Sequence, residues 1–280
     1  MMYEKRKSRT GQDIALALLI VLAAYCLFPI FMALLNSFKT KPEMFTDVMA
    51  FPQKFSVENY ARSFRKMKYL ASFFNNLVIV AIGMGGIAFF SAMAGWAMCR
   101  TKTKLSGFLF GLFVFSMLIP FNSIMIPLYR IAGALHLTNS TVGMGVIYIG
   151  LGVGMAIFMY HGFAKSSIPL EIEEAACIDG CGMFATFFLI VMPLLGPITA
   201  TICIMNILWM WNDFLLPLIM LQSPKNYTLL LSTNMLFGQY SSDWPAILSA
   251  LVLAVIPVVV LYAFLQKNIL QGIVNGAVKS

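Results

Sequence analysis

Long stretches without a charged side chain limit the folds that this chain can adopt. A helix that crosses roughly 30 Å of hydrocarbon needs about 20 mainly apolar residues. Six stretches reach that length: Ile14–Leu35, Leu77–Cys99, Leu105–Tyr129, Thr141–Tyr160, Phe184–Asn212 and Pro245–Leu265. None alternates in the short pattern of barrel strands, and a helix satisfies its own backbone hydrogen bonds in lipid. We therefore predict an all-α membrane protein with six transmembrane helices.

The composition excludes a soluble protein of the same length. Only 11% of the residues are charged, whereas a soluble domain carries about 25%. The net charge of +8 comes from bases clustered between the apolar stretches, which is typical of membrane flanks rather than of a nucleic-acid site. The predicted partner of most of the surface is the lipid bilayer, and no nucleic acid is expected.

The distribution of bases bears on orientation. If both termini are cytoplasmic, ten Lys and Arg lie inside and nine outside, and seven of those nine fall in residues 36–72. The short loops favour this orientation, but the long first loop nearly cancels the bias. We predict a cytoplasmic N-terminus (1–13), an uncleaved membrane domain (14–265) and a cytoplasmic tail (266–280). Within the first loop, Glu58–Lys68 is predicted to form a short interfacial helix.

Neither the cysteines nor the glycines predict a cofactor in this chain. Cys177 and Cys181 have helical spacing but lack further ligands, so no metal site is expected. Two groups of glycines lie inside apolar helices without the lysine of a nucleotide loop, which predicts close helix packing and no ATP binding: Gly83, Gly85 and Gly86, and Gly150, Gly152 and Gly154.

The segment between the fourth and fifth stretches is unusual for its acidity. Residues 161–183 hold four acids against one base. Pro169 suits a first helical turn, the acids follow near the positive helix end, and Gly180 suits a left-handed turn that ends the helix. These residues are compatible with two interpretations. The helix either docks into a basic cleft of a partner or is a solvated connection between two spans.

A motif in this segment resembles a known family signature. Glu174-Ala175-Ala176, then Gly180, then Ile190, Met192 and Pro193 are similar to the signature of binding-protein-dependent ABC importer permeases, with Met in place of Leu at position 192. The resemblance implies a type I ABC importer permease fold. It also implies that about 169–182 is a coupling helix that docks on a separate ATPase, through these residues: Glu173, Glu174, Ala175, Ala176, Asp179 and Gly180.

Other stretches resemble the sugar branch of this family, namely its maltose-type second permease subunit and its multiple-sugar and raffinose-type permeases. They are Asn36–Lys39, Glu58–Tyr60, Trp211–Pro217 and Gln271–Lys279. The resemblance implies cytoplasmic termini and a tail at the ATPase interface that includes Gln271, Gly272, Gly276 and Lys279. It further implies a second homologous permease subunit, two cytoplasmic ATPase subunits holding ATP and Mg, and an extracytoplasmic sugar-binding protein.

Polar residues in the fifth stretch suggest a route for the solute. An unbroken helix from Phe184, at 1.5 Å per residue, would place Asp213 about 44 Å along its axis, near the outer end of the span. Candidates for the lining of the path are Asn122, Asn206, Trp209, Trp211, Asn212 and Asp213. The alternatives are an interfacial aromatic belt for the tryptophans and inter-helix hydrogen bonding for asparagines, including Asn75 and Asn76.

The predicted function is therefore the permease subunit of a carbohydrate importer that is not itself an enzyme, in a prokaryotic cell membrane. An importer of a non-sugar solute and a gradient-driven carrier are the alternatives. Only Asp213 carries a charge between Phe184 and Gln222, which disfavours the carrier because ion-coupled carriers usually place acids and bases within the membrane. A membrane enzyme is disfavoured because no His, Asp and Glu cluster lies at helical spacing within a span.

Overall fold

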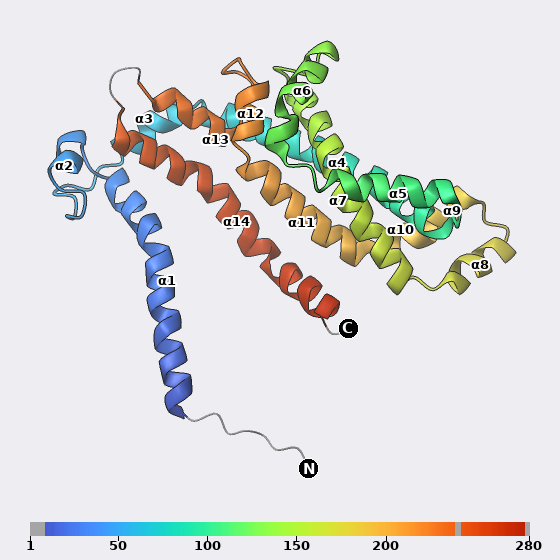
Figure 1. The fold of residues 1–280 in the computed structure, drawn as a ribbon. Helices are drawn as coiled ribbons and strands as arrows, with labels where there is room; N and C mark the ends of the chain where they lie inside the picture. Colours follow the sequence, from blue (N-terminus) through green and yellow to red (C-terminus); the bar gives the residue numbers. More distant parts are fainter. Residues whose placement is uncertain (1–8, 239–241, 278–280) are drawn as a thin grey trace. The chain divides into compact units, whose positions relative to one another are not determined.

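The computed structural model describes the backbone of residues 9–238 and 242–277 and the side chains of residues 11–238 and 242–263. In this part of the chain there are helices and no strands, so the predicted all-α class is confirmed. The helices (Figure 1) are α1 (Arg9–Ser37), α2 (Lys41–Thr46), α3 (Glu58–Lys66), α4 (Tyr69–Arg100), α5 (Lys104–Ser116), α6 (Phe121–Ala134), α7 (Thr141–Ser167), α8 (Leu170–Ile178), α9 (Met183–Thr186), the π-helix η1 (Phe187–Val191), α10 (Met192–Leu194), α11 (Gly196–Asn212), α12 (Leu215–Met220), α13 (Leu229–Ser232), the 3₁₀-helix η2 (Thr233–Leu236) and α14 (Trp244–Ala277).

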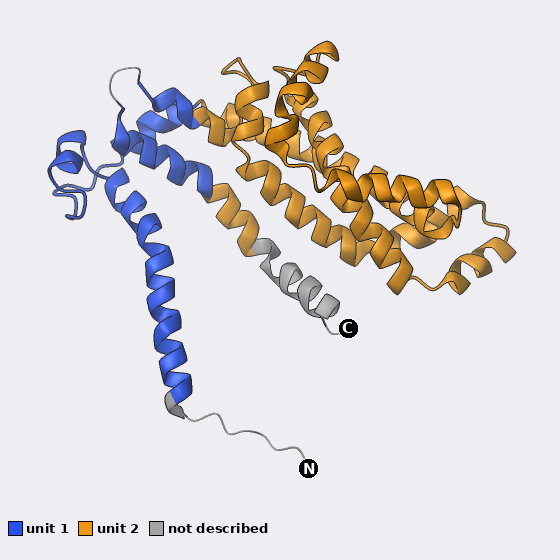
Figure 2. Ribbon diagram, viewed as in Figure 1, with its two compact units in different colours: residues 1–67, 233–255 blue, residues 68–232, 256–280 orange. Residues whose placement is uncertain are grey.

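The chain divides into two compact units (Figure 2). Unit 1 comprises residues 1–67 and 233–255, and unit 2 comprises residues 68–232 and 256–280. Four helices of the described chain are long and apolar enough to cross a membrane: α1, α4, α7 and the Trp244–Ala263 part of α14. Two bent pairs raise the number of candidate spans to six, in agreement with the predicted number.

The third predicted span is not one straight helix. It consists of α5 and α6, which meet at an angle of 106°. Pro120 causes the break, because it has no N–H to donate and disfavours helical backbone at the residue before it. Met117, Leu118 and Ile119 accordingly form tight three-residue hydrogen bonds instead of continuing the α-helix.

The fifth predicted span is also broken, so the expectation of an unbroken helix from Phe184 to Asn212 is wrong. The segments Met183–Leu194 and Gly196–Asn212 are bent by 71°. Pro197 lies in the first turn of α11, where its missing N–H is tolerated. The Thr199 hydroxyl donates to the Leu195 carbonyl across the bend at 2.9 Å. The straight-line placement of Asp213 at about 44 Å from Phe184 therefore does not hold.

Glycines let the helices of unit 2 pack closely. Gly86 and Gly152 lie where α4 meets α7, Gly83 lies against Met210 of α11 and Tyr148 of α7, and Gly154 lies against the end of α5. A Cβ atom added at Gly83, Gly86, Gly152 or Gly154 would lie 2.1 to 2.7 Å from a neighbouring side-chain atom. These four positions fit the predicted role of the glycines in helix packing. The other two predicted glycines, Gly85 and Gly150, have open space instead.

Gly95 offers a direct test of this packing. A Cβ there would lie 2.8 Å from the Tyr160 Cβ and 3.0 Å from the backbone nitrogen of His161. We expect Gly95→Ala to destabilise the detergent-solubilised protein by about 1–3 kcal/mol, because α4 and α7 must move apart. The matched change Gly85→Ala, in the same helix with no atom within 4 Å, leaves the thermal midpoint unchanged or slightly higher. Equal midpoints for the two variants would contradict this account.

Unit 1 contains a buried polar cluster that joins α3 to the end of α1. The Asn59 amide donates to the carbonyls of Ser37 and Lys39, both at 2.8 Å. The Ser37 hydroxyl lies 2.6 Å from the Tyr60 hydroxyl, and the buried Lys39 ammonium donates to the carbonyls of Asp47 and Val48. The prediction of a short helix at Glu58–Lys68 is confirmed by α3, which ends at Lys66. The cluster also connects Asn36–Lys39 with Glu58–Tyr60.

Candidate functional site

Helix α8 begins and ends with clear sequence signals. Pro169 is its N-cap, one residue before the predicted first-turn position, and Glu171 and Glu173 lie in the first turn, where the helix dipole favours acids. At the other end, the Cys181 amide donates to the Ala176 carbonyl and the Gly180 amide to the Cys177 carbonyl. This is the Schellman arrangement, which requires a left-handed residue after the cap. Gly180 supplies it with φ +84°, as predicted.

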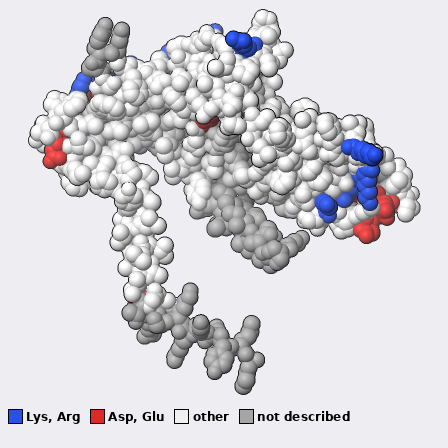
Figure 3. All heavy atoms as spheres, viewed as in Figure 1, with Lys and Arg blue, Asp and Glu red and all other residues white. Residues whose placement is uncertain are grey.

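The exposed surface of α8 combines acids with apolar side chains. Glu171, Glu174 and Asp179 are exposed, and Ile178 is 87% exposed. Ala175 is exposed as well, whereas Ala176 is buried. Figure 3 shows acidic and basic side chains gathered at the end of unit 2 that carries α8. An exposed, capped helix with this mixture of side chains suits docking against a basic protein surface.

Glu173 differs from the other acids of α8 because its side chain faces inward. One carboxylate oxygen accepts hydrogen bonds from Arg100 Nε at 2.9 Å and Arg100 Nη2 at 2.8 Å. The other oxygen accepts from Trp96 Nε1 at 3.1 Å. The side chain of Glu173 is 9% exposed and that of Arg100 is 20% exposed. Glu173 therefore contacts its own chain, in contrast to Glu174.

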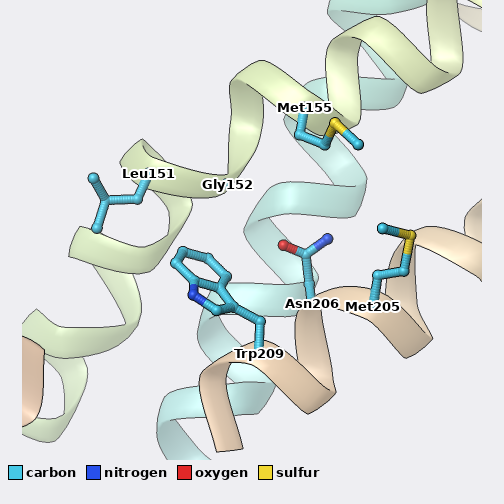
Figure 4. A pocket seen from close by; sticks show the side chains of 6 residues that line it. All are labelled: Leu151, Gly152, Met155, Met205, Asn206 and Trp209. Carbon is cyan, nitrogen blue, oxygen red and sulfur yellow. The ribbon is translucent and has the colours of Figure 1, made fainter. Parts of the chain in front are cut away.

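A second candidate feature of unit 2 is a cavity of about 250 Å³ between α7 and α11. It is lined by Leu151, Gly152, Met155, Met205, Asn206 and Trp209. Figure 4 shows Asn206 extending from α11 toward α7, with the Trp209 ring beside it. The Asn206 amide nitrogen donates to the Ile202 carbonyl at 2.9 Å, which leaves the amide oxygen as the polar acceptor at an apolar wall.

The other four predicted lining residues are not among those that line this cavity. Trp211 is buried against Phe73, with ring centroids 5.7 Å apart. Asp213 accepts the Tyr148 hydroxyl at 2.9 Å and caps α12 through the Leu215 and Leu216 amides. Asn122 and Asn212 are exposed, on α6 and α11 respectively.

Asparagines also hold the segment that follows α12. The Asn75 amide donates to the carbonyls of Lys225 and Tyr227, and Asn76 accepts the Leu229 amide at 2.8 Å. Sequence reasoning missed Asn139, whose side-chain oxygen accepts the amides of Gln222 and Ser223. Asn139 has φ +53°, a conformation that asparagine adopts more readily than most residues, but its distant partners leave no signal in the sequence.

Two further predictions concern metal binding and the C-terminal tail. The described residues contain no group of three or more His, Cys, Asp and Glu side chains that could hold a metal ion. Gln271, Gly272 and Gly276 lie in α14, but their side chains are outside the described part of the chain. Lys279 lies outside the described residues altogether.

The chain is similar in sequence to permease proteins of sugar transport systems. The chain is 38% identical over 261 residues to the probable starch degradation products transport system permease protein AmyC of Thermoanaerobacterium thermosulfurigenes, covering 93% of this chain and 94% of the relative. It is 34% identical over 275 residues to the melibiose/raffinose/stachyose import permease protein MelC of Bacillus subtilis, covering 98% and 99%.

A solved structure shows the same fold. It belongs to a bacterial ABC transporter involved in the import of the acidic polysaccharide alginate, and it matches with a TM-score of 0.77 at 19% identity, covering 95% of this chain and 99% of that one. The family model for the binding-protein-dependent transport system inner membrane component matches residues 84–275, which include α8, Gly180 and both walls of the cavity. The chain therefore belongs to the family of inner membrane components of binding-protein-dependent transport systems.

Proposed function

We propose that this chain is the permease subunit of an ATP-driven importer of oligosaccharides. The observation that carries the proposal is the exposed acidic helix α8, capped by Gly180, in a multi-pass helical protein of this family. The relatives named for starch products and for melibiose, raffinose and stachyose support a carbohydrate as the solute.

In the proposed assembly, partner proteins supply ATP hydrolysis, the other half of the sugar path and delivery of the sugar. Two cytoplasmic ATPase subunits hold ATP and Mg and dock on α8, with Glu174 facing their basic groups. A second homologous permease subunit completes the path, and an extracytoplasmic binding protein delivers the sugar. Both termini lie in the cytoplasm, as the bases of the short loops favour. Closure of the ATPase pair then pulls on α8 and switches the permeases between inward-facing and outward-facing states.

We assign the cavity between α7 and α11 to the sugar path. A pyranose has apolar faces and a rim of hydroxyl groups. The partly exposed Trp209 ring offers a flat apolar surface, and the Asn206 oxygen offers an acceptor for a hydroxyl. Trp211 and Asp213 support this region by packing and capping.

Asn206→Leu tests this assignment. Loss of one hydrogen bond of about 1 kcal/mol is expected to reduce sugar uptake at low substrate concentration about fivefold. Asn212→Leu is the matched control, because Asn212 makes the same back-bond to the carbonyl four residues earlier and does not line the cavity. Uptake by radiolabelled-sugar assay should fall for the first variant alone. An equal loss for both variants, or no loss for either, would contradict the assignment.

The proposed function itself is tested by reconstitution. Proteoliposomes that contain this chain, its second permease and the ATPase should accumulate an oligosaccharide such as raffinose or maltotriose when ATP and the binding protein are present. Collapse of ion gradients with ionophores should leave uptake intact. Uptake that needs an ion gradient and no ATPase would establish a carrier instead, and ATP-driven uptake of an amino acid or polyol alone would establish a non-sugar importer.

A further inference from the structure

The inward-facing acid of α8 joins this helix to a distant part of unit 2. Arg100 is the last residue of α4, and Glu173 lies 73 positions later in the chain. Three hydrogen bonds of 2.8 to 3.1 Å converge on the Glu173 carboxylate, two from Arg100 and one from Trp96. Charge-assisted hydrogen bonds of this length are about twice as strong as neutral ones.

The residues around this pair are themselves held in place. Arg100 Nη2 also donates to the carbonyl of Ile168 at 2.8 Å, which fixes the segment that leads into α8. The Trp96 ring packs against the buried Phe187 of η1, with ring centroids 5.3 Å apart. The ends of α4 and α7 and the start of the fifth span thus meet at one point.

Helix α8 has few other attachments to unit 2. Ala176 is its one buried residue, and Glu171, Glu174, Cys177, Ile178 and Asp179 are exposed. Its connections are the Ile168–Pro169 segment and the Gly180–Gly182 turn, which are not helical. Without a side-chain contact, a force on α8 would bend these connections rather than move the spans.

We propose that Glu173 and Arg100 are positioning residues that make α8 and the end of α4 move as one body. This inference rests on the proposed function, because it describes how movement of an ATPase bound to α8 reaches the membrane. The acids of α8 then have separate roles: Glu174 faces the ATPase, and Glu173 transmits its movement to α4.

The test uses the reconstituted importer and the variants Glu173→Gln and Arg100→Gln. Both should retain the bound ATPase, since Glu174 and the exposed face are unchanged. The amount of sugar imported per ATP hydrolysed should fall about tenfold, within the usual range of coupling between two sites. Arg100→Lys, which keeps the charge but lacks the planar fork that makes three hydrogen bonds to Glu173 and Ile168, should recover part of this ratio. Lys102→Gln, which removes an exposed base two residues away, should match the unmodified protein.

The double variant Glu173→Gln/Arg100→Gln shows whether the two residues act through each other or independently. If the two residues act through each other, the double variant is no worse than the more affected single variant. The inference is overturned if both single variants import sugar at the normal ratio, if their losses multiply in the double variant, or if either variant releases the ATPase. Failure of the unmodified protein to bind an ATPase would instead overturn the proposed function, before any variant is compared.

Discussion

Gly180→Ala is expected to reduce sugar uptake about tenfold in the reconstituted importer while leaving membrane insertion intact. Gly180 has φ +84°, and a residue with a side chain is strained in this region by about 1–2 kcal/mol. Space is not the cause, because no atom lies within 4 Å of an added Cβ. A cost of this size changes the population of the native turn by a factor of about 5–30. The last turn of α8 and Asp179 then lose their fixed direction, so ATP hydrolysis no longer drives uptake efficiently.

Gly182→Ala is the matched control for this prediction. Gly182 lies two residues further on, also has open space around an added Cβ, and has φ −71°, which alanine adopts without strain. Sugar uptake and ATP hydrolysis are measured for both variants at equal amounts of protein in the membrane. If both alanine variants transport normally, the left-handed turn has no part in coupling.

Glu174→Lys is the second change with a large expected effect. Glu174 is exposed on α8, and the proposed partner surface is basic, so a lysine replaces attraction by repulsion. Like charges placed against each other at an interface cost several kcal/mol. We expect the amount of ATPase that co-purifies with the chain to fall at least about tenfold, and uptake to fall with it.

Two controls distinguish loss of the Glu174 contact with the ATPase from a nonspecific effect of added positive charge. They are high salt and a charge reversal at another acid. High salt screens exposed charges and should reduce the difference between Glu174→Lys and the unmodified protein. Glu58→Lys makes the same change at an exposed acid at the start of α3, in the loop predicted to lie outside, and should retain the ATPase. Normal co-purification of the ATPase with Glu174→Lys would show that this side chain does not face the partner.

The apolar stretches predicted the membrane helices well, but they did not predict where two of them bend. Hydropathy reports the length of a span and not its straightness, and Pro120 and Pro197 lie inside stretches that carry no charge. Prolines are tolerated within membrane helices when neighbouring groups satisfy the freed backbone. At the second bend, the Leu195 carbonyl accepts both the amide and the hydroxyl of Thr199, contacts that follow from the folded backbone.

At the candidate site, the sequence predicted features that depend on neighbouring residues, but it did not predict contacts between residues far apart in the chain. The cap of α8 depends on residues next to one another, so Pro169, the acids and Gly180 were sufficient to predict it. The role of Glu173 depends on Arg100, which no local pattern connects with it. Asp213 was likewise assigned to the path on its polarity alone, whereas its hydrogen bond with Tyr148 appears only in the folded chain.

The stretches Asn36–Lys39 and Glu58–Tyr60 were noted for a resemblance alone. In the structure the two stretches contact each other. The Asn59 amide donates to the carbonyls of Ser37 and Lys39, and the Tyr60 hydroxyl contacts the Ser37 hydroxyl. Asn59 is buried together with Asn36, Ser37 and Lys39, so loss of either stretch would leave buried polar groups of the other unpaired. The two stretches therefore form one structural element of unit 1.

Cross-linking from α8 to the ATPase tests whether this helix docks on the ATPase. Cys177 is exposed on α8, and the chain with serine at its other four cysteines, Cys26, Cys99, Cys181 and Cys203, carries a single reactive thiol. A short thiol-to-amine cross-linker is added to membranes that contain the assembled importer, and the products are identified by mass spectrometry. The account predicts a covalent product between Cys177 and a lysine at the basic surface of the ATPase. An assembled importer in which Cys177 reacts with reagent but never joins the ATPase would contradict it.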